Sequence, residues 1–168
     1  MKTQIIAAIA ALLAVPAAHA QDKQTATAIF IGADGKDSGK ALLTGAKAGV
    51  LIDLQVAGLP ANKWVAFHIH EDGKCDAAHG HEAAGGHFNP GKAEHGLLAA
   101  NGPHAGDMPN QYVGDDGILR AQVFNTMVSL DERNAIRGRA LIIHENSDDY
   151  RSQPAGDAGR RLACAVIK

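Results

Sequence analysis

The sequence predicts an all-β fold, organised as a sandwich or barrel, and three observations support this prediction. Short runs that alternate between apolar and polar residues, or are wholly apolar, recur along the chain. Long helical periodicity is scarce, and turn-forming residues rich in Gly, Asp and Pro separate the short runs. The runs that we expect to form strands are residues 25–31, 50–56, 64–70, 121–128, 139–144 and 162–168.

Residues 50–56 show the alternation most clearly. Val50, Ile52, Leu54 and Val56 fall on one face of a strand, because successive side chains point to opposite sides of a sheet. We expect this face to line the core. The turn signals that separate the runs lie at residues 32–35, 58–60 and 114–117.

Two long stretches show neither the helical nor the strand period. Residues 71–111 and 145–160 are rich in Gly, Asp, Asn and Pro and are expected to form extended loops. Loops of this length usually carry function, so we expect functional residues to lie in them.

The chain of 168 residues leaves room for one domain preceded by a secretory signal peptide. Residues 1–20 carry one charge, Lys2, followed by an apolar run at residues 5–15 and a small-residue sequence that ends at Ala20. This run is about half of the roughly 20 residues that a membrane-spanning helix needs. We therefore expect cleavage after Ala20, a domain at residues 21–168, and no permanent membrane anchor.

The charge balance argues against a nucleic-acid or anionic-membrane partner. Sixteen Lys and Arg residues against eighteen Asp and Glu residues give a net charge of −2. An apolar content of 46% also excludes extended disorder.

The two cysteines, Cys75 and Cys164, both lie after the predicted cleavage site. Export to an oxidising compartment favours a disulfide between them, and the alternative is two separate buried thiols. Such a disulfide closes a loop of about 90 residues, for which the chain-entropy model gives about 4 to 5 kcal/mol of stabilisation.

Histidines cluster strongly, which suggests a metal site. Seven of the nine histidines lie within residues 68–104. His68 and His70 are two positions apart on a predicted strand, so both rings point to the face opposite Phe67 and Ile69. Taken alone, this spacing is a weak signal, and it favours a plain structural or surface pair over a metal site.

Farther along the chain, three histidines and a carboxylate share a Gly-rich loop. His87, His95, His104 and Asp107 offer a ligand set that zinc accepts in tetrahedral geometry, and the alternative is a solvated polar loop. His144 ends an apolar strand, where a satisfied core histidine is the alternative to a ligand. The helical zinc-protease motif is excluded, because Gly85 stands where the second histidine after His81 is required.

Taken together, these segments resemble a bacterial secreted copper/zinc superoxide dismutase over essentially the whole chain after residue 20. The resemblance implies a Greek-key β-sandwich or flattened barrel with two long functional loops, and an enzyme that converts superoxide to dioxygen and hydrogen peroxide. The segments that carry it are residues 67–70, 85–90, 95–96, 104–107, 138–144 and 156–167, the last including Arg161 and Cys164.

The resemblance also implies a role for individual residues. A copper ion would be held by His68, His70, His87 and His144, and a zinc ion by His87, His95, His104 and Asp107, with His87 bridging the two as an imidazolate. His87 would leave copper on reduction and carry a proton. Asp148 would link a copper ligand to a zinc ligand, His68 to His95. Arg161 would guide and dock the anion, and the Cys75–Cys164 disulfide would tie the metal loop to the last strand.

Some features depart from the family pattern or leave alternatives open. His79 and His81 match no family ligand, so we expect solvated loop residues, with an auxiliary metal-acquisition site as the alternative. We expect superoxide as the partner and a periplasmic location, and we leave open a homodimer. A periplasmic protein that buffers copper or zinc without turnover is the second functional hypothesis, which the anion-docking Arg161 argues against.

Overall fold

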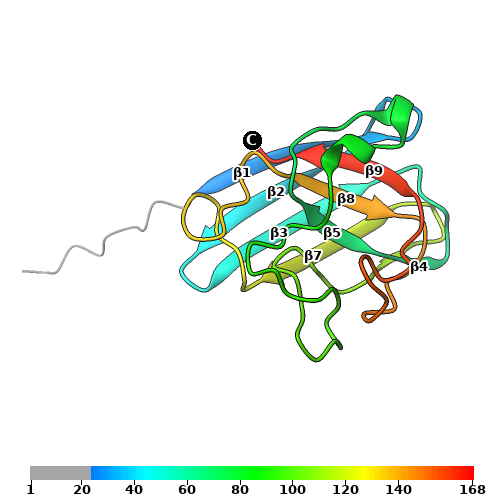
Figure 1. The fold of residues 1–168 in the computed structure, drawn as a ribbon. Helices are drawn as coiled ribbons and strands as arrows, with labels where there is room; N and C mark the ends of the chain where they lie inside the picture. The colour runs from blue at the N-terminus through cyan, green and yellow to red at the C-terminus, as the bar shows by residue number, and fades with distance from the viewer. Residues whose placement is uncertain (1–23) are drawn as a thin grey trace, which may run out of the picture.

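Residues 24–168 form one antiparallel sheet of nine strands that curls into a nearly closed barrel, with almost no helix in this part of the chain (Figure 1). The computed structural model describes residues 24–168, so the predicted signal peptide at residues 1–20 lies outside the described residues. The all-β prediction is confirmed, and the strand order is β4-β6-β7-β3-β2-β1-β9-β8-β5. The strands are β1 (Thr25–Gly32), β2 (Asp37–Ala46), β3 (Gly49–Val56), β4 (Lys63–Val65), β5 (Phe67–His70), β6 (Gln111–Val113), β7 (Leu119–Asn125), β8 (Ala140–His144) and β9 (Arg161–Val166).

The barrel closes at Ala66, the single residue between β4 and β5. These two strands lie at opposite edges of the sheet although they are consecutive in sequence. The Ala66 N–H donates to the Asn146 carbonyl at 2.8 Å, and the His144 N–H donates to the Ala66 carbonyl at 2.9 Å. Ala66 therefore brings the two sheet edges together, and β5 runs beside β8 with its four residues buried.

The core lies on the inner face of the sheet, as the alternation in residues 50–56 predicts. In β3, Val50, Ile52, Leu54 and Val56 are buried, whereas Leu51, Asp53 and Gln55 face outward. Burying each large apolar side chain contributes about 1.5 to 3 kcal/mol. The largest side chains of the core include Phe30, Leu43, Ile52, Phe67, Ile69, Leu141 and Ile143.

The structure departs from the predicted strands in three places. The run at residues 64–70 is divided into β4 and β5, because the chain changes sheet partner at Ala66. The run at residues 121–128 is displaced toward the N-terminus, since β7 begins at Leu119 and ends at Asn125. Strands β2 and β6 were not expected; in β2 two glycines and the Leu42-Leu43 pair hide the alternation, and β6 has only three residues.

The two long loops are confirmed: the first connects β5 to β6 and the second connects β8 to β9 (Figure 1). The first contains two short 3₁₀ turns, η1 (Ala77–His79) and η2 (Glu82–Ala84). The predicted disulfide joins Cys75 of this loop to Cys164 of β9, with 5.6 Å between the two Cα atoms. In residues 24–168 the structure has no helix long and apolar enough to cross a membrane.

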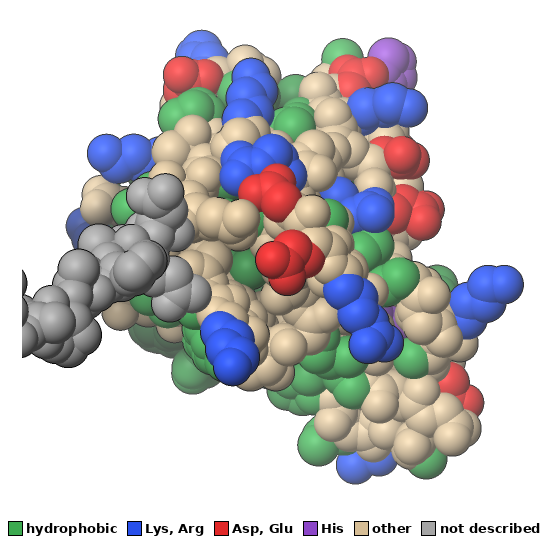
Figure 2. Space-filling view, turned by 90° about the vertical axis from the view of Figure 1, so that its left-hand side faces the viewer, with side chains coloured by type: hydrophobic (Ala, Val, Ile, Leu, Met, Phe, Trp, Pro, Cys, Tyr) green, Lys and Arg blue, Asp and Glu red, His purple; other side chains and the backbone are tan. Residues whose placement is uncertain are grey.

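Charged side chains of both signs are mixed over the face shown in Figure 2. Lys and Arg side chains lie beside Asp and Glu side chains, with apolar side chains between them. No large patch of one sign covers this face, in keeping with the small net charge of −2.

Candidate metal centre

Strand β5 places two histidines on the side of the sheet that faces the long loops. His68 and His70 alternate with Phe67 and Ile69, which belong to the apolar core. This arrangement confirms the facing predicted from the two-residue spacing. Both rings are nevertheless buried, because the first loop folds over them.

The first loop returns to β5 through backbone hydrogen bonds. The Phe88 N–H donates to the Ile69 carbonyl at 2.8 Å, and the Ile69 N–H donates to the Gly106 carbonyl at 2.9 Å. Two isolated bridges in the same region pair His70 with His87 and His68 with Asp107. Side chains that are far apart in sequence are thereby placed around the two histidines of β5.

The first cluster consists of four imidazoles from three parts of the chain. One ring nitrogen from each lies within 4.8 Å of the others, and all four rings are buried. The Nε2 atoms of His70 and His144 are 3.3 Å apart. The members of the first cluster are His68, His70, His87 and His144.

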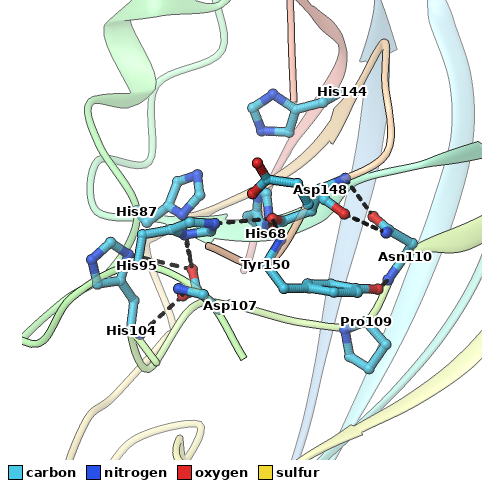
Figure 3. Close-up of polar contacts among 12 residues, drawn as sticks. His68, His87, His95, His104, Asp107, Pro109, Asn110, His144, Asp148 and Tyr150 are labelled. Atoms are coloured by element: carbon cyan, nitrogen blue, oxygen red, sulfur yellow. Dashed lines mark hydrogen bonds and ion pairs between the residues drawn. The ribbon is translucent and has the colours of Figure 1, made fainter. Parts of the chain in front are cut away.

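The second cluster shares His87 with the first and surrounds a carboxylate. Three imidazole Nδ1 atoms converge on Asp107 Oδ1, at 2.9 Å for His87, 3.1 Å for His95 and 3.3 Å for His104 (Figure 3). The other carboxylate oxygen of Asp107 accepts hydrogen bonds from the backbone N–H groups of Gly96 and His104. The members of the second cluster are His87, His95, His104 and Asp107, and all are buried.

Hydrogen bonds outside the clusters fix the orientation of the rings. His68 Nε2 lies 2.8 Å from Asp148 Oδ2, and His95 Nε2 lies 3.0 Å from Asp148 Oδ1, so this buried carboxylate joins a ring of each cluster (Figure 3). His70 Nδ1 lies 2.9 Å from the Gly85 carbonyl. Such contacts select the ring nitrogen that points toward the centre of a cluster.

The donor sets fit metal ions. His68 Nδ1 and His87 Nε2 are buried and have no hydrogen-bond partner in the described part of the chain, although buried polar atoms are normally paired. The first cluster offers four imidazole nitrogens, a set that suits copper. The second offers three nitrogens and one oxygen, a set that zinc accepts in tetrahedral geometry.

The ionisation of these groups also favours cation binding. Burial and the neighbouring rings of His87 and His144 lower the pKa of His70 well below its ordinary value, and burial lowers the pKa of His87 to about 4 although Asp107 opposes this shift. Burial raises the pKa of Asp107, but its hydrogen bonds to histidines outweigh burial and hold that pKa far below the usual range. Near neutral pH the rings of His70 and His87 are therefore neutral, and the second cluster includes a carboxylate anion.

His95 differs from the rings of the first cluster. Burial lowers its pKa, but hydrogen bonds and attraction from Asp107 and Asp148 outweigh burial and raise the pKa to about 9. A cation that binds the second cluster near neutral pH must therefore displace a proton from His95.

Arg161 lies at the start of β9 and is held by two loop carbonyls. Its Nη1 donates to the His81 carbonyl and its Nη2 donates to the Gly85 carbonyl, each at 2.8 Å. The side chain is 13% exposed, and Glu82 lies 3.4 Å from Nη2. Because the Gly85 carbonyl also contacts His70 Nδ1, one backbone oxygen connects Arg161 to the first cluster.

The structure adds three residues that the sequence did not single out. The Asn110 side chain donates to the Asp148 carbonyl at 2.9 Å and accepts from the Asp148 N–H at 2.8 Å (Figure 3). Tyr150 donates its backbone N–H to Asp148 Oδ1, and its hydroxyl oxygen accepts from the Asn110 N–H. A side chain at Gly156 would overlap Asp148 Oδ1. In the sequence Asn110 and Tyr150 lie in polar loops with no spacing that marks them, and Gly156 was noted only as the first residue of the resembling segment 156–167.

We expect Asn110→Ala to weaken zinc binding by roughly tenfold, because removing groups that position metal ligands typically costs 10- to 100-fold in affinity. The variant loses both hydrogen bonds that hold the backbone of Asp148. Competition with a chelator measures the change. Gln111→Ala is the matched control, since the exposed Gln111 side chain bonds only to the Pro109 carbonyl, and equal affinities of the two variants would contradict this role of Asn110.

The structure corrects the prediction for one of the two unassigned histidines. His79 is exposed, as expected, and its Nδ1 lies 2.6 Å from an Asp76 carboxylate oxygen. His81 is fully buried, so the expectation of a solvated loop residue was wrong. The disulfide and η2 hold this part of the loop against β9, which removes the His81 ring from water. Neither histidine joins a group of metal-binding geometry within residues 24–168.

Comparisons with known proteins agree with this fold. A family model described as copper/zinc superoxide dismutase (SODC) matches residues 37–167. A protein named copper–zinc superoxide dismutase 2 from Aquifex aeolicus is 49% identical over 162 residues, which cover 94% of this chain and 94% of that protein.

Two solved structures extend the comparison to three dimensions. A SOD-like protein from Bacillus subtilis superposes with a TM-score of 0.79 at 34% identity, covering 83% of this chain and 95% of the other. The Cu/Zn superoxide dismutase from Brucella abortus superposes with a TM-score of 0.72 at 27% identity, covering 86% of this chain and 100% of the other. With buried imidazole clusters on an antiparallel barrel, and with relatives at this identity and coverage, the chain belongs to the copper/zinc superoxide dismutase family.

Proposed function

We propose that this chain catalyses the disproportionation of superoxide, in which two superoxide anions and two protons yield one dioxygen and one hydrogen peroxide. The first cluster would hold copper through His68, His70, His87 and His144, and the second would hold zinc through His87, His95, His104 and Asp107. The observation that carries this proposal is that His87 belongs to both clusters. The two ring nitrogens of His87 differ in their surroundings. Nδ1 lies 2.9 Å from Asp107 Oδ1, whereas Nε2 is buried and has no protein partner in the described part of the chain.

When bound, copper supplies one-electron exchange between two oxidation states, and zinc supplies fixed positive charge without redox chemistry. His87 would connect the two sites as a shared imidazolate, and its Nε2 is the atom that we assign to carry a proton toward the peroxide product. Asp148 would hold the rings of His68 and His95 in place through its two carboxylate oxygens.

Arg161 is the residue that we assign to attract and orient the anion. Its guanidinium stays charged at any working pH. Nη1 keeps a second N–H after donating to the His81 carbonyl, whereas Nη2 donates to the Gly85 carbonyl and also lies 3.4 Å from the Glu82 carboxylate. Burial is the main cause that lowers the pKa of His70 and of His144, and the charge of Arg161 adds to it, which places this charge near the first cluster. A protein that only stores copper needs no such group, so Arg161 favours catalysis over metal buffering.

The direct test measures copper and zinc content together with superoxide consumption on the metal-loaded protein. The proposal predicts one copper and one zinc per chain and rapid superoxide consumption. Full loading without superoxide consumption would support the metal-buffering alternative instead.

We expect Arg161→Ala to lower the rate constant for superoxide at low substrate by roughly tenfold or more, since focusing of charge changes association rates by 10- to 1,000-fold. Metal content should not change, because Arg161 contacts backbone carbonyls and no member of either cluster through its own hydrogen bonds. The control is Arg160→Ala, which removes the neighbouring cation from an exposed ion pair with Glu145. A parallel loss of copper in Arg161→Ala would argue against a docking role.

We also propose that residues 1–20 are removed on export and that the enzyme works in the periplasm. The apolar run at residues 5–15, the small residues before Ala20, and the disulfide all support an exported protein. Fractionation of cells followed by N-terminal sequencing should find a mature chain that begins at Gln21. A cytoplasmic chain that retains residues 1–20 would contradict this proposal.

A further inference from the structure

His81 is a buried imidazole that neither metal cluster uses. Its side chain is fully buried, and both ring nitrogens lack a hydrogen-bond partner within residues 24–168. Leaving a buried polar group unpaired costs free energy, so a role is needed to explain an imidazole at this position. Its backbone is also unusual, with a φ of 59° in the left-handed region, which is uncommon outside glycine but enriched for histidine.

The backbone of His81 forms half of the support for Arg161. The two carbonyls that accept from the guanidinium belong to His81 and Gly85, the residues on either side of η2. Both residues have positive φ values, 59° and 71°. The direction of the guanidinium therefore depends on this one short turn keeping its place and conformation.

Several contacts hold η2 in place. The His81 ring lies at the N-terminal end of η2, toward β1. Ala84 packs with Cys164 and Ile142 in a small buried cluster, which secures the other end of the turn. The His81 N–H donates to the Asp76 carbonyl at 2.7 Å. The backbone of Gly32, which pairs with Ala163 of β9, lies close enough to the His81 ring to oppose the lowering of the ring's pKa by burial.

We propose that His81 is a positioning residue for Arg161: its ring, buried toward the end of β1, holds η2 so that the carbonyls of His81 and Gly85 aim the guanidinium at the anion. This inference rests on the proposed function, because it assigns a task to the residue that docks superoxide. The ring acts through packing and backbone geometry and touches neither substrate nor metal.

The same geometry disfavours an auxiliary metal site at His81. A cation at this ring would lie near the guanidinium of Arg161, which already opposes protonation of His81. The Asp76 carboxylate, which would attract a cation, is engaged with His79.

The test compares His81→Asn with His79→Asn in the copper- and zinc-loaded protein. Asn tolerates the left-handed backbone, so His81→Asn removes the buried ring while keeping the conformational preference at this position. Inorganic phosphate, which binds guanidinium groups, serves as the probe anion, and its affinity is followed by ³¹P relaxation beside the copper. We expect His81→Asn to weaken phosphate binding by roughly tenfold, in line with the cost of misplacing a contact group. His79→Asn should leave it unchanged.

Three further measurements separate positioning from general damage. Metal content should be unchanged, and amide hydrogen exchange should rise in residues 76–85 of His81→Asn while the rest of the barrel keeps its protection. In an Arg161→Ala background, His81→Asn should weaken phosphate binding no further, because the two residues act in series. Normal phosphate affinity in His81→Asn, or an equal effect in the Arg161→Ala background, would overturn the inference.

The outcomes also distinguish this inference from the proposed function. If Arg161→Ala itself keeps full phosphate affinity, the docking role of Arg161 fails, and the role of His81 fails with it. If Arg161→Ala binds weakly and His81→Asn binds normally, only the role of His81 fails. Should His81→Asn not fold, His81→Gln is measured in its place. It keeps most of the buried volume but not the rigid ring, so it is expected to show a smaller loss in the same direction, with the same two overturning results.

Discussion

His87→Ala is expected to lose both metals, the largest effect that the structure predicts for a single substitution. His87 is the one residue shared by the two groups of metal-binding geometry in residues 24–168. Removing its ring takes one nitrogen from each proposed site and leaves Asp107 without one of its three histidine neighbours. We expect the metal affinity of both sites to fall by roughly a hundredfold or more. Loss of a residue that only orients a ligand typically lowers metal affinity by about 10- to 100-fold, and loss of a ligand itself should cost at least as much.

Two matched substitutions show whether this double loss is specific to His87. His104 belongs only to the second cluster, so His104→Ala should release zinc and retain copper. His144 belongs only to the first cluster, so His144→Ala should release copper and retain zinc. Elemental analysis after dialysis measures all three variants. Retention of either metal at full occupancy in His87→Ala would refute a shared ligand.

Removal of the disulfide is expected to have the largest effect on stability. Cys75 and Cys164 are 89 residues apart, and the chain-entropy model gives about 4 to 5 kcal/mol for closing a loop of this length. The variant should replace both cysteines by Ala, because Cys164 is fully buried and a hydroxyl at this position would add a cost of its own. The free energy of unfolding of the metal-free protein, from denaturant titration, should fall by about 2 to 5 kcal/mol.

The same substitution should also affect the site, because the disulfide holds the loop that carries η2 against β9. We expect the metal-loaded variant to bind phosphate more weakly, since the carbonyls that support Arg161 lie in this loop. Reduction of the wild-type disulfide should reproduce both effects. If the free energy of unfolding stays within about 1 kcal/mol of wild type, the disulfide contributes little to stability and this prediction is wrong.

The sequence predicted most of the barrel because burial on one face leaves a period of two. Residues 50–56 are an example, with Val50 and Ile52 inside and Leu51 and Asp53 outside. Strand β2 escaped prediction because Leu42 faces outward at 49% exposure while its neighbour Leu43 is buried, so two adjacent apolar residues break the pattern. The division of residues 64–70 depends on closure of the sheet through Ala66, a tertiary event that no local pattern records.

The residues of the candidate site that lie on a regular strand were easier to predict from the sequence than those in the irregular loops. The facing of His68 and His70 follows from strand alternation, and the grouping of His87, His95 and His104 follows from their clustering in one Gly-rich loop. The division of the ligands between two metals came from the family resemblance, because an irregular loop has no period. Asn110 holds Asp148 by hydrogen bonds between residues 38 positions apart, a contact that only the folded loops create. His81 was misjudged because a Gly-rich segment suggests solvent exposure, while the disulfide and η2 bury its ring.

The shared role of His87 is tested most directly by crystals of the copper- and zinc-loaded protein, with diffraction recorded on both sides of the copper and zinc absorption edges. We expect two anomalous peaks, copper beside His87 Nε2 and zinc beside His87 Nδ1. The other members of the first cluster should surround the copper, and the other members of the second cluster should surround the zinc. A single metal peak, or two peaks of which one lies away from the His87 ring, would contradict this expectation.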